Sequence, residues 1–354
     1  MSVLNLRWRI PALLMALMLL PVLLIACSSE EEKTVVNFHD GQWATLWAQN
    51  AVAMYITEHG FGYPVAEIQG TTGTMKVALP QGDLDVNLEI WRMNIPDWYD
   101  EFVVNGPVVD LAGTNDDLPA GSKGQSLASG GQAFYIPTFV ADANPGLKSV
   151  DDLPDYVHLF PDPEDPGMGL LINCITGWQC EKINRAKWHA YGLFETYNVQ
   201  NPGSGGALDA AIKGAYDAGE PVLTYYWEPT SLLNNLDMTR LEEPVNTPEC
   251  QAALDEAVAE VPYESTQGCG YPFGDVHIGV HETLVERAPE VTEFLSNFYI
   301  GSKEVGNIES WKDSNEKTWQ EAGINYLQNN EAVWSQWVDD KIADKVKKAL
   351  ENES

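Results

Sequence analysis

Basic residues are scarce in this chain of 354 residues. Only 20 lysines and arginines stand against 52 aspartates and glutamates, which gives a formal net charge of −32. Such a surface repels phosphate backbones and anionic lipids, so the charge argues against a nucleic-acid-binding protein. It suits a cationic or zwitterionic ligand, or a saline environment in which ions screen the surface. An acid excess that only aids solubility accounts for the charge equally well.

Motifs of several protein classes are absent. The sequence has no phosphate-binding P-loop and no series of apolar spans, so it encodes neither an ATPase nor a multi-span permease. Ser204 lies in a Pro-Gly-Ser-Gly-Gly segment rather than in the Gly-x-Ser-x-Gly frame of a hydrolase. His277 and His281 share one face of an apparent strand, but no third ligand accompanies them. We therefore expect no metal and no cofactor.

The start of the chain carries one long apolar run, which follows a short basic segment. The run covers residues 10–26 and is at the lower limit of length for a membrane-spanning helix. Because it ends in the small residue Ala26 just before Cys27, it is typical of a bacterial lipoprotein signal. We expect residues 1–26 to be removed, Cys27 to be lipidated and residues 27–34 to form a tether to the cell membrane. An uncleaved membrane anchor is the alternative, and both place the body of the protein outside the cytoplasm.

Four further cysteines fall into two local pairs. Cys174 and Cys180 are six positions apart, and Cys250 and Cys269 are nineteen apart. In an oxidising compartment we expect a disulfide within each pair, although four cysteines allow three connectivities. A zinc site is the competing interpretation, but the Cys-x-x-Cys spacing that usually marks one is missing.

Short apolar runs alternate with helical patterns from Lys33 onward. This alternation predicts an α/β fold with a largely parallel sheet covered on both faces. The predicted strands are Val35–Phe38, Tyr63–Ile68, Asp83–Trp91, Gln132–Val140, Gly169–Ile172 and Pro221–Trp227. The predicted helices are Trp43–His59, Asn184–Tyr197, Gly206–Ala218, Glu249–Val261, Glu290–Tyr299 and Glu331–Leu350. The last helix has an apolar stripe that includes Trp334 and Trp337, which assigns these two tryptophans to the core.

Three of the twelve tryptophans occupy unusual positions for core residues. Trp91 ends its strand on the polar face, Trp178 lies between Cys174 and Cys180, and Trp227 ends a buried strand. Ligands of open α/β sheets bind beyond the carboxyl ends of strands. An indole there offers an electron-rich face to a quaternary ammonium ion, and each contact is worth roughly 0.5–2 kcal/mol. Ordinary core or rim positions for these tryptophans are the alternative.

A second anchor is needed, because a few ring contacts supply only part of the roughly 8 kcal/mol of micromolar binding. For a betaine the anchor would be its carboxylate, held by backbone N–H groups of a tight turn. The amides of Gln179 and Cys180 are the candidates, since a clamped turn can point successive donors inward.

Several segments, taken in order, resemble the glycine betaine-type substrate-binding proteins of ABC importers. They are Gly82-Asp83-Leu84-Asp85-Val86 running on to Glu89-Ile90-Trp91, then Cys174 with Gly177-Trp178-Gln179-Cys180, then Tyr225-Tyr226-Trp227-Glu228-Pro229, with weaker support from Leu241-Glu242-Glu243-Pro244. The likeness spans roughly Val35 to Tyr299. It implies that Trp91, Trp178 and Trp227 enclose a trimethylammonium group, and that a disulfide surrounds the middle tryptophan.

The resemblance also raises questions about individual residues. A second glycine follows the tryptophan in the Gly-Trp-Gly-Cys version of the loop, and Gln179 replaces it here. This departure bears on the carboxylate contacts and hence on which zwitterion is bound. Trp43, after the first strand, and Tyr135 are candidates for further walls of the site. Glu89 either touches the ligand or orients a neighbouring side chain.

The fold that the resemblance implies is the two-lobed periplasmic-binding-protein fold of type II, with the ligand in the cleft between the lobes. Two crossover strands join the lobes, and we expect them near Gln132–Pro137 and Asn235–Glu243. Residues 35–133 would form the first part of lobe one, residues 134–240 lobe two, and residues 241–354 the return to lobe one. Closure of the cleft would complete the site, which couples binding to closure.

The functional expectation is a lipid-anchored receptor, and not an enzyme, that delivers a quaternary ammonium osmolyte to an importer. Its permease and ATPase would be separate chains. Glycine betaine is the first choice, and choline, proline betaine and carnitine remain open. A receptor for another cation or an amino acid is one alternative. A surface hydrolase that uses Asp83, Asp85 and Glu89 as paired acids is another.

Overall fold

The computed structural model describes residues 33–113 and 119–353. The signal segment and Cys27 lie outside these residues, so their assignment stays a prediction. Within the described residues, no helix has both the length and the apolar character that crossing a bilayer requires. Residues from Lys33 onward form one structural unit.

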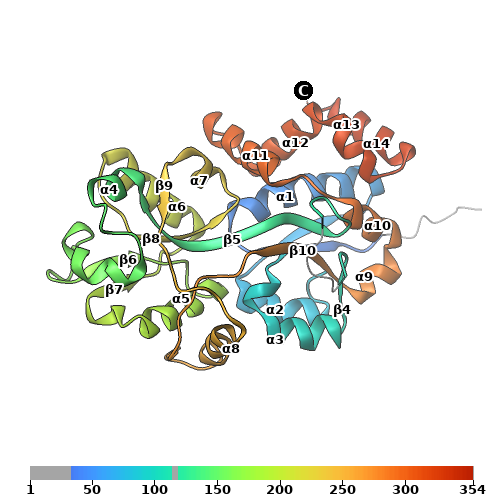
Figure 1. The fold of residues 1–354 in the computed structure, drawn as a ribbon. Coiled ribbons are helices and arrows are strands. Elements are labelled where there is room, and N and C mark those ends of the chain that lie inside the picture. Colours follow the sequence, from blue (N-terminus) through green and yellow to red (C-terminus); the bar gives the residue numbers. More distant parts are fainter. Residues whose placement is uncertain (1–32, 114–118, 354) are drawn as a thin grey trace, which may run out of the picture. The chain divides into compact units, whose positions relative to one another are not determined.

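The strands form a mixed sheet in which two groups of parallel strands are joined through antiparallel neighbours (Figure 1). They are β1 (Val36–Asp40), β2 (Val65–Gln69), β3 (Val86–Ile90), β4 (Val108–Asp110), β5 (Gln125–Pro137), β6 (Gly169–Ile172), β7 (Tyr197–Gln200), β8 (Thr224–Glu228), β9 (Met238–Arg240) and β10 (Gly274–His281). Strand β1 is parallel to β2 and β3, and β6 is parallel to β7 and β8. The predicted α/β architecture is confirmed, and each predicted strand has an observed counterpart. The prediction of a largely parallel sheet is wrong, because β5 and β10 are antiparallel to all their neighbours.

Strand β5 connects the two groups. It pairs with β10 between Gln125 and Gly130, and it pairs with β8 between Gly131 and Tyr135. Figure 1 shows β5 as a long strand that runs from the helices around β8 to those around β10. We call the unit around β1 to β4 and β10 the first lobe and the unit around β6 to β9 the second lobe. The predicted first crossing at Gln132–Pro137 lies within β5, and the change of partner occurs just before it.

The second crossing lies later in the chain than the predicted Asn235–Glu243. Strand β9 still pairs with β5 in the second lobe, and α8 packs on α5 there. The disulfide Cys250–Cys269 and the buried Leu254 fix this segment against the second lobe. The chain returns to the first lobe only with β10. A small apolar cluster around the disulfide thus packs this segment on the second lobe, whereas the predicted boundary assigned residues 241–354 to lobe one.

Helices cover both groups of strands. The α-helices are α1 (Ala44–Tyr55), α2 (Thr72–Gln81), α3 (Pro96–Tyr99), α4 (Thr138–Ala143), α5 (Gln179–Ala190), α6 (Gly205–Ala218), α7 (Ser231–Asn235), α8 (Pro248–Ala257), α9 (Glu282–Arg287), α10 (Pro289–Asn297), α11 (Ser302–Ser314), α12 (Trp319–Asn329), α13 (Glu331–Trp334) and α14 (Asp340–Leu350). The 3₁₀ and π segments are η1 (Ile56–Phe61), η2 (Arg92–Asn94), η3 (Asp100–Val104), η4 (Val150–Leu159), η5 (Leu193–Glu195) and η6 (Ser335–Trp337). In the first lobe, α1 packs against α11 and α12, while α2 and α3 lie on the other side (Figure 1).

The predicted helix Glu331–Leu350 is broken in the structure. It consists of α13, η6 and α14, with Val338 in an extended conformation between them. The break follows from Asp339, whose side chain accepts the backbone N–H of Ile342 and starts a new helix. The assignment of Trp334 and Trp337 to the core is confirmed, since both are buried.

A buried carboxyl lies where the C-terminal helices meet the second lobe. Glu309 of α11 accepts the backbone N–H of Ser231 at the start of α7, at 3.1 Å. Burial raises the pKa of Glu309 to about 7, and the charge of Asp209 adds to the rise. Asp209 on α6 accepts the hydroxyl of Tyr226, and burial raises the pKa of Asp209 to about 6. The contact between the two lobes therefore contains acids that the fold favours in their protonated form.

Replacing Glu309 with glutamine is expected to stabilise the protein above neutral pH. Because the pKa of Glu309 is higher in the folded than in the unfolded state, wild-type stability is lost as pH rises from about 4.5 to about 7. Glutamine keeps an oxygen for the Ser231 N–H and carries no charge. We expect a gain of about 1–3 kcal/mol at about pH 8 and little at about pH 5. Thermal unfolding at both pH values measures it, with exposed Glu286→Gln as control. Equal gains at both pH values contradict the explanation.

Candidate functional site

A cavity lies where the carboxyl ends of β1, β3 and β8 meet the start of α5, as expected for an open α/β sheet. It has a volume of about 60 Å³. Since a water molecule needs about 10–15 Å³ on this measure, the cavity has room for roughly four to six such groups. Its lining consists of His39, Trp43, Thr72, Met75, Glu89, Trp91, Asn94, Ile95, Gln132, Trp178, Gln179, Cys180, Tyr225 and Trp227. Both lobes and the connecting strand β5 contribute to it.

Four tryptophans from separate parts of the chain line this cavity, and we call them the tryptophan cage: Trp43, Trp91, Trp178 and Trp227. Trp178 is central to the arrangement. Its ring lies 5.6 Å from that of Trp43 at 90° and 5.6 Å from that of Trp227 at 87°. These edge-to-face contacts are favourable for aromatic pairs, and all four rings line the same cavity. The structure thus brings together the three tryptophans singled out in the sequence, together with Trp43.

The lobes are also joined at the cage by hydrogen bonds. The indole N–H of Trp178, in the second lobe, donates to the carbonyl of Gly41 in the first lobe at 2.9 Å. The backbone N–H of Gly73 donates to the carbonyl of Gly177 at 3.3 Å. Both bonds involve the cysteine loop of the second lobe, which thus contacts two segments of the first lobe, the β1–α1 loop at Gly41 and the first turn of α2 at Gly73.

Glu89 holds the first-lobe side of the cage. One oxygen of its carboxylate accepts the indole N–H groups of Trp43 at 2.7 Å and of Trp91 at 3.0 Å, and the other accepts the amide of Gln49 at 2.7 Å. Burial raises the pKa of Glu89, although these hydrogen bonds oppose the rise. Glu89 therefore orients two cage rings, and its buried negative charge lies at the wall of the cavity.

The start of α5 presents backbone donors to the cavity. The helix begins at Gln179, five residues before the predicted Asn184, and Trp178 at its N-cap makes no side-chain cap. The first amides of a helix have no carbonyl partner within it, and the helix dipole makes this end favourable for anions. Because Gln179 has helical backbone geometry, the absence of a glycine there causes no strain. Gln179 and Cys180 are the first two residues of the helix and line the cavity, and their role as donors to a carboxylate stays a prediction.

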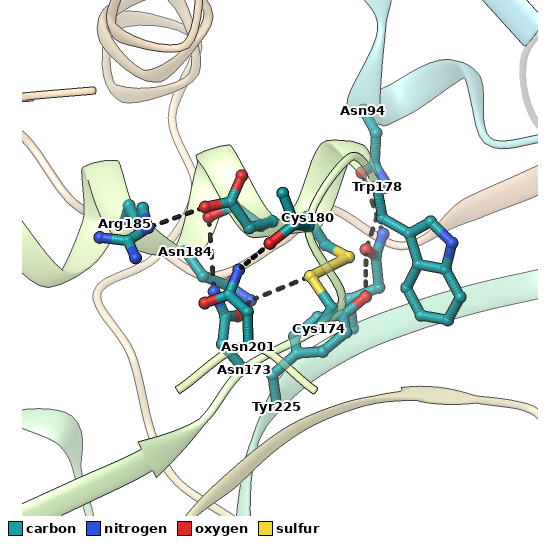
Figure 2. The surroundings of a disulfide bond; sticks show 12 residues. Asn94, Asn173, Cys174, Trp178, Cys180, Asn184, Arg185, Asn201 and Tyr225 are labelled. Carbon is teal, nitrogen blue, oxygen red and sulfur yellow. Dashed lines mark hydrogen bonds and ion pairs between the residues drawn. A yellow bond between two sulfur atoms is a disulfide. The ribbon is translucent and has the colours of Figure 1, made fainter. Parts of the chain in front are cut away.

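Disulfide and amide contacts fix this turn. Cys174 is bonded to Cys180, as expected, and Cys250 to Cys269. Asn184 donates to the side chain of Asn173 at 2.7 Å. Figure 2 shows the Trp178 indole on the side of the turn away from Arg185. The turn therefore directs Trp178 toward the cavity from a rigid base.

His39 at the end of β1 is a cavity residue that sequence analysis missed. It is 2% exposed. Burial lowers the pKa of His39 to about 4, although Asn87 and the backbone of Gly70 and Thr71 oppose the fall, so its ring is neutral at pH 7 and keeps one N–H donor. The sequence offered one indication that His39 lies at the site, namely its position directly before the loop that carries Trp43.

A polar cluster on the other side of the cavity was also missed. The side-chain amides of Asn94 and Gln132 exchange two hydrogen bonds, at 3.1 and 3.0 Å. The hydroxyl of Tyr225 donates to Gln132 at 2.8 Å. Asn94 belongs to the first lobe, Gln132 to β5 and Tyr225 to the second lobe. The cluster therefore ties the cavity to the connecting strand.

Other singled-out residues lie elsewhere. Tyr135 is not among the lining residues, and its hydroxyl donates to Glu228 at 2.7 Å. Asp85 forms an ion pair with Arg287 and accepts the backbone N–H of Asn37, so it does not pair with Glu89. Across residues 33–113 and 119–353, no cluster of three or more His, Cys, Asp or Glu side chains could hold a metal ion.

Residues 35–329 match the family model OpuAC, described as the substrate-binding domain of the ABC-type glycine betaine transport system. The chain belongs to this family. OpuAC proteins are transport substrate-binding proteins rather than enzymes. The engagement of Asp85 and Glu89 in structural contacts agrees with this and leaves the hydrolase alternative without its paired acids.

Two relatives of this OpuAC chain are named for the small methylated compounds that they bind. A trimethylamine N-oxide-binding protein of Pelagibacter ubique is 22% identical over 259 residues, which are 72% of this chain and 75% of that protein. The glycine betaine-binding periplasmic protein OusX of Dickeya dadantii is 27% identical over 181 residues, 49% of this chain and 52% of that protein. These relatives show what similar proteins bind.

The OpuAC fold is shared with solved structures. The glycine betaine/L-proline-binding protein ProX of Borrelia burgdorferi aligns with a TM-score of 0.67 at 17% identity, covering 88% of this chain and 99% of that one. Such a match at low identity establishes the architecture, here the periplasmic-binding-protein fold of type II. The predicted fold class is confirmed.

Proposed function

We propose that this protein captures a trimethylammonium osmolyte, with glycine betaine as the leading candidate, and delivers it to an ABC importer. The observation that carries the proposal is the convergence of Trp43, Trp91, Trp178 and Trp227 on one cavity. N-methyl groups bring no strong hydrogen-bond donors, so aromatic faces suit them. Four such faces contribute about 2–8 kcal/mol, compared with about 8 kcal/mol for micromolar binding.

The carboxylate of glycine betaine would be held at the start of α5. The free amides of Gln179 and Cys180 and the positive end of the helix dipole favour an anion there. The neutral ring of His39 offers one further N–H without adding a positive charge that would repel the ammonium group. The buried charge of Glu89 balances that ammonium group from behind the rings.

Trimethylamine N-oxide is a second candidate ligand. The relative from Pelagibacter ubique carries that name. The N-oxide has the same three methyl groups and a single oxygen, and the cavity of about 60 Å³ suits so compact a molecule. A single donor such as His39 would suffice for its oxygen.

Delivery to an importer requires that the protein act outside the cytoplasm. The signal-like segment and Cys27 support a lipid anchor in the cell membrane. The two disulfides suit an oxidising compartment. The permease and ATPase would be separate chains that receive the ligand when the lobes separate.

Titration of the full chain with glycine betaine, followed by tryptophan fluorescence and calorimetry, tests the proposal. We expect saturable binding at micromolar concentrations without consumption of the ligand. Competition with trimethylamine N-oxide, choline and proline ranks the candidates. If no trimethylammonium compound binds below about 1 mM while an amino acid does, the proposal is wrong.

A further inference from the structure

A second cavity, of about 530 Å³, adjoins the tryptophan cage. Gln179 lines both cavities, and Gly73 and Gly177, which are hydrogen-bonded across the lobes, line the second one. Its walls come from α2 and α3 of the first lobe and from α5 of the second. The second cavity therefore continues the cleft beyond the cage.

Two lysines line this cavity from opposite lobes. Lys76 belongs to α2 and Lys182 to α5. In the described part of the chain, neither lysine has a carboxylate within 4.0 Å, and Lys182 lies 5.7 Å from the ring of Tyr263. Burial and the charge of Lys182 lower the pKa of Lys76, while Asp97 opposes the change. Two positive charges thus face one cavity without an ion-pair partner, in a protein of net charge −32.

The two lysines repel each other across the second cavity, and an anion between them would remove this repulsion. Contact between the lobes brings two like charges toward each other in a partly buried space, where their repulsion is screened less than at an open surface. The exposed Asp97 and Glu101 also line the cavity but form no ion pair with either lysine. An anionic group between Lys76 and Lys182 would convert this repulsion into attraction.

The small size of the cage indicates that this anionic group is part of the ligand bound there. With room for roughly four to six water-sized groups, the cage takes a trimethylammonium head with an arm no longer than that of glycine betaine, whose carboxylate reaches the start of α5. A ligand with a longer arm must extend past Gln179 into the second cavity. We propose that Lys76 and Lys182 form an anion subsite for the carboxylate of a trimethylammonium acid whose arm is longer than that of glycine betaine. This proposal rests on the proposed function.

The test compares ligands that share a head but differ in the arm. Calorimetry is run with tetramethylammonium, glycine betaine and 4-trimethylammoniobutanoate on the wild type, on Lys76→Gln/Lys182→Gln, and on Lys303→Gln/Lys341→Gln, which removes the same charge from exposed positions. We expect the Lys76/Lys182 variant to lose about 10–30-fold in affinity for the butanoate. Its affinities for the other two ligands should change less than about twofold, as should all affinities of the control variant.

Other outcomes overturn the proposal. If glycine betaine and the butanoate weaken equally, the lysines act through general charge or through the fold. If tetramethylammonium binding to the wild type depends on chloride and this dependence is lost in the Lys76/Lys182 variant without any chain-length effect, the subsite takes a free anion instead. If glycine betaine binds and the butanoate does not, the arm has no subsite. If no trimethylammonium compound binds, the proposed function itself fails.

Discussion

Replacing Trp178 with alanine is expected to weaken glycine betaine binding by about 100–1,000-fold. The change removes one ring face of the cage, worth about 0.5–2 kcal/mol, and the edge contact with Trp43 across the lobes, worth about 0.5–1.5 kcal/mol. It also removes the hydrogen bond to Gly41 that joins the lobes, worth about 0.5–1.5 kcal/mol. A total near 3–4 kcal/mol corresponds to the stated loss.

Two controls separate these contributions. Trp178→Phe keeps an aromatic face but loses the N–H, so a loss of about tenfold is expected. Trp319 packs on Trp47 outside the cavity, and Trp319→Phe should leave the affinity unchanged. Circular dichroism and calorimetry report folding and affinity for each variant. If Trp178→Ala binds glycine betaine within about threefold of the wild type, the cage does not hold the ligand.

Replacing Glu89 with glutamine is expected to reduce the affinity by about 10–100-fold. The carboxylate accepts indole N–H groups on one oxygen and Gln49 on the other. A glutamine amide has a single oxygen, so its NH₂ group must face a buried donor on one of the two sides. Leaving a buried donor unpaired costs about 1–3 kcal/mol, and the cage rings lose their fixed orientation. The negative charge behind the ammonium group is lost as well.

A pH series distinguishes the role of Glu89 from simple destabilisation. Because burial raises the pKa of Glu89, its carboxylate becomes protonated at a higher pH than an exposed glutamate does. Affinity of the wild type for the permanently charged head should therefore fall on acidification from about pH 7.5 to about pH 5, with a smaller change in Glu89→Gln. The exposed Glu282→Gln serves as the matched control. Parallel pH profiles for the wild type and Glu89→Gln would contradict this role.

Three of the cage tryptophans could be picked out from the sequence, because their local positions are unusual for core residues. Trp91 and Trp227 come at strand ends, and Trp178 lies within a short cysteine loop. Glu89 alternates with the apolar residues of β3, so the face of the strand on which it lies could be predicted. The hydrogen bonds of Trp43, Trp91 and Gln49 to its carboxylate could not, because they depend on how α1 packs over the sheet.

What sequence analysis missed depends on contacts between distant segments. In the sequence, His39 is an ordinary residue beside a loop, and only the packing around it places its buried ring at the cavity. The packing of α8 on the second lobe depends on Cys250–Cys269 and Leu254, and the local sequence pattern of this segment does not reveal it. The helix break at Asp339 was missed because the apolar stripe continues through it, although Asp339 caps the start of α14.

The pairing of β5 with both lobes has a mechanical consequence. Since β5 changes its pairing partner between Gly130 and Gly131, rotation of one lobe against the other would bend this strand there, as well as the segment that leads into β10. A side chain at Gly130 would collide with the Trp91 ring. The bending point of β5 therefore lies directly against a ring of the tryptophan cage, so lobe rotation and the position of the Trp91 ring are coupled.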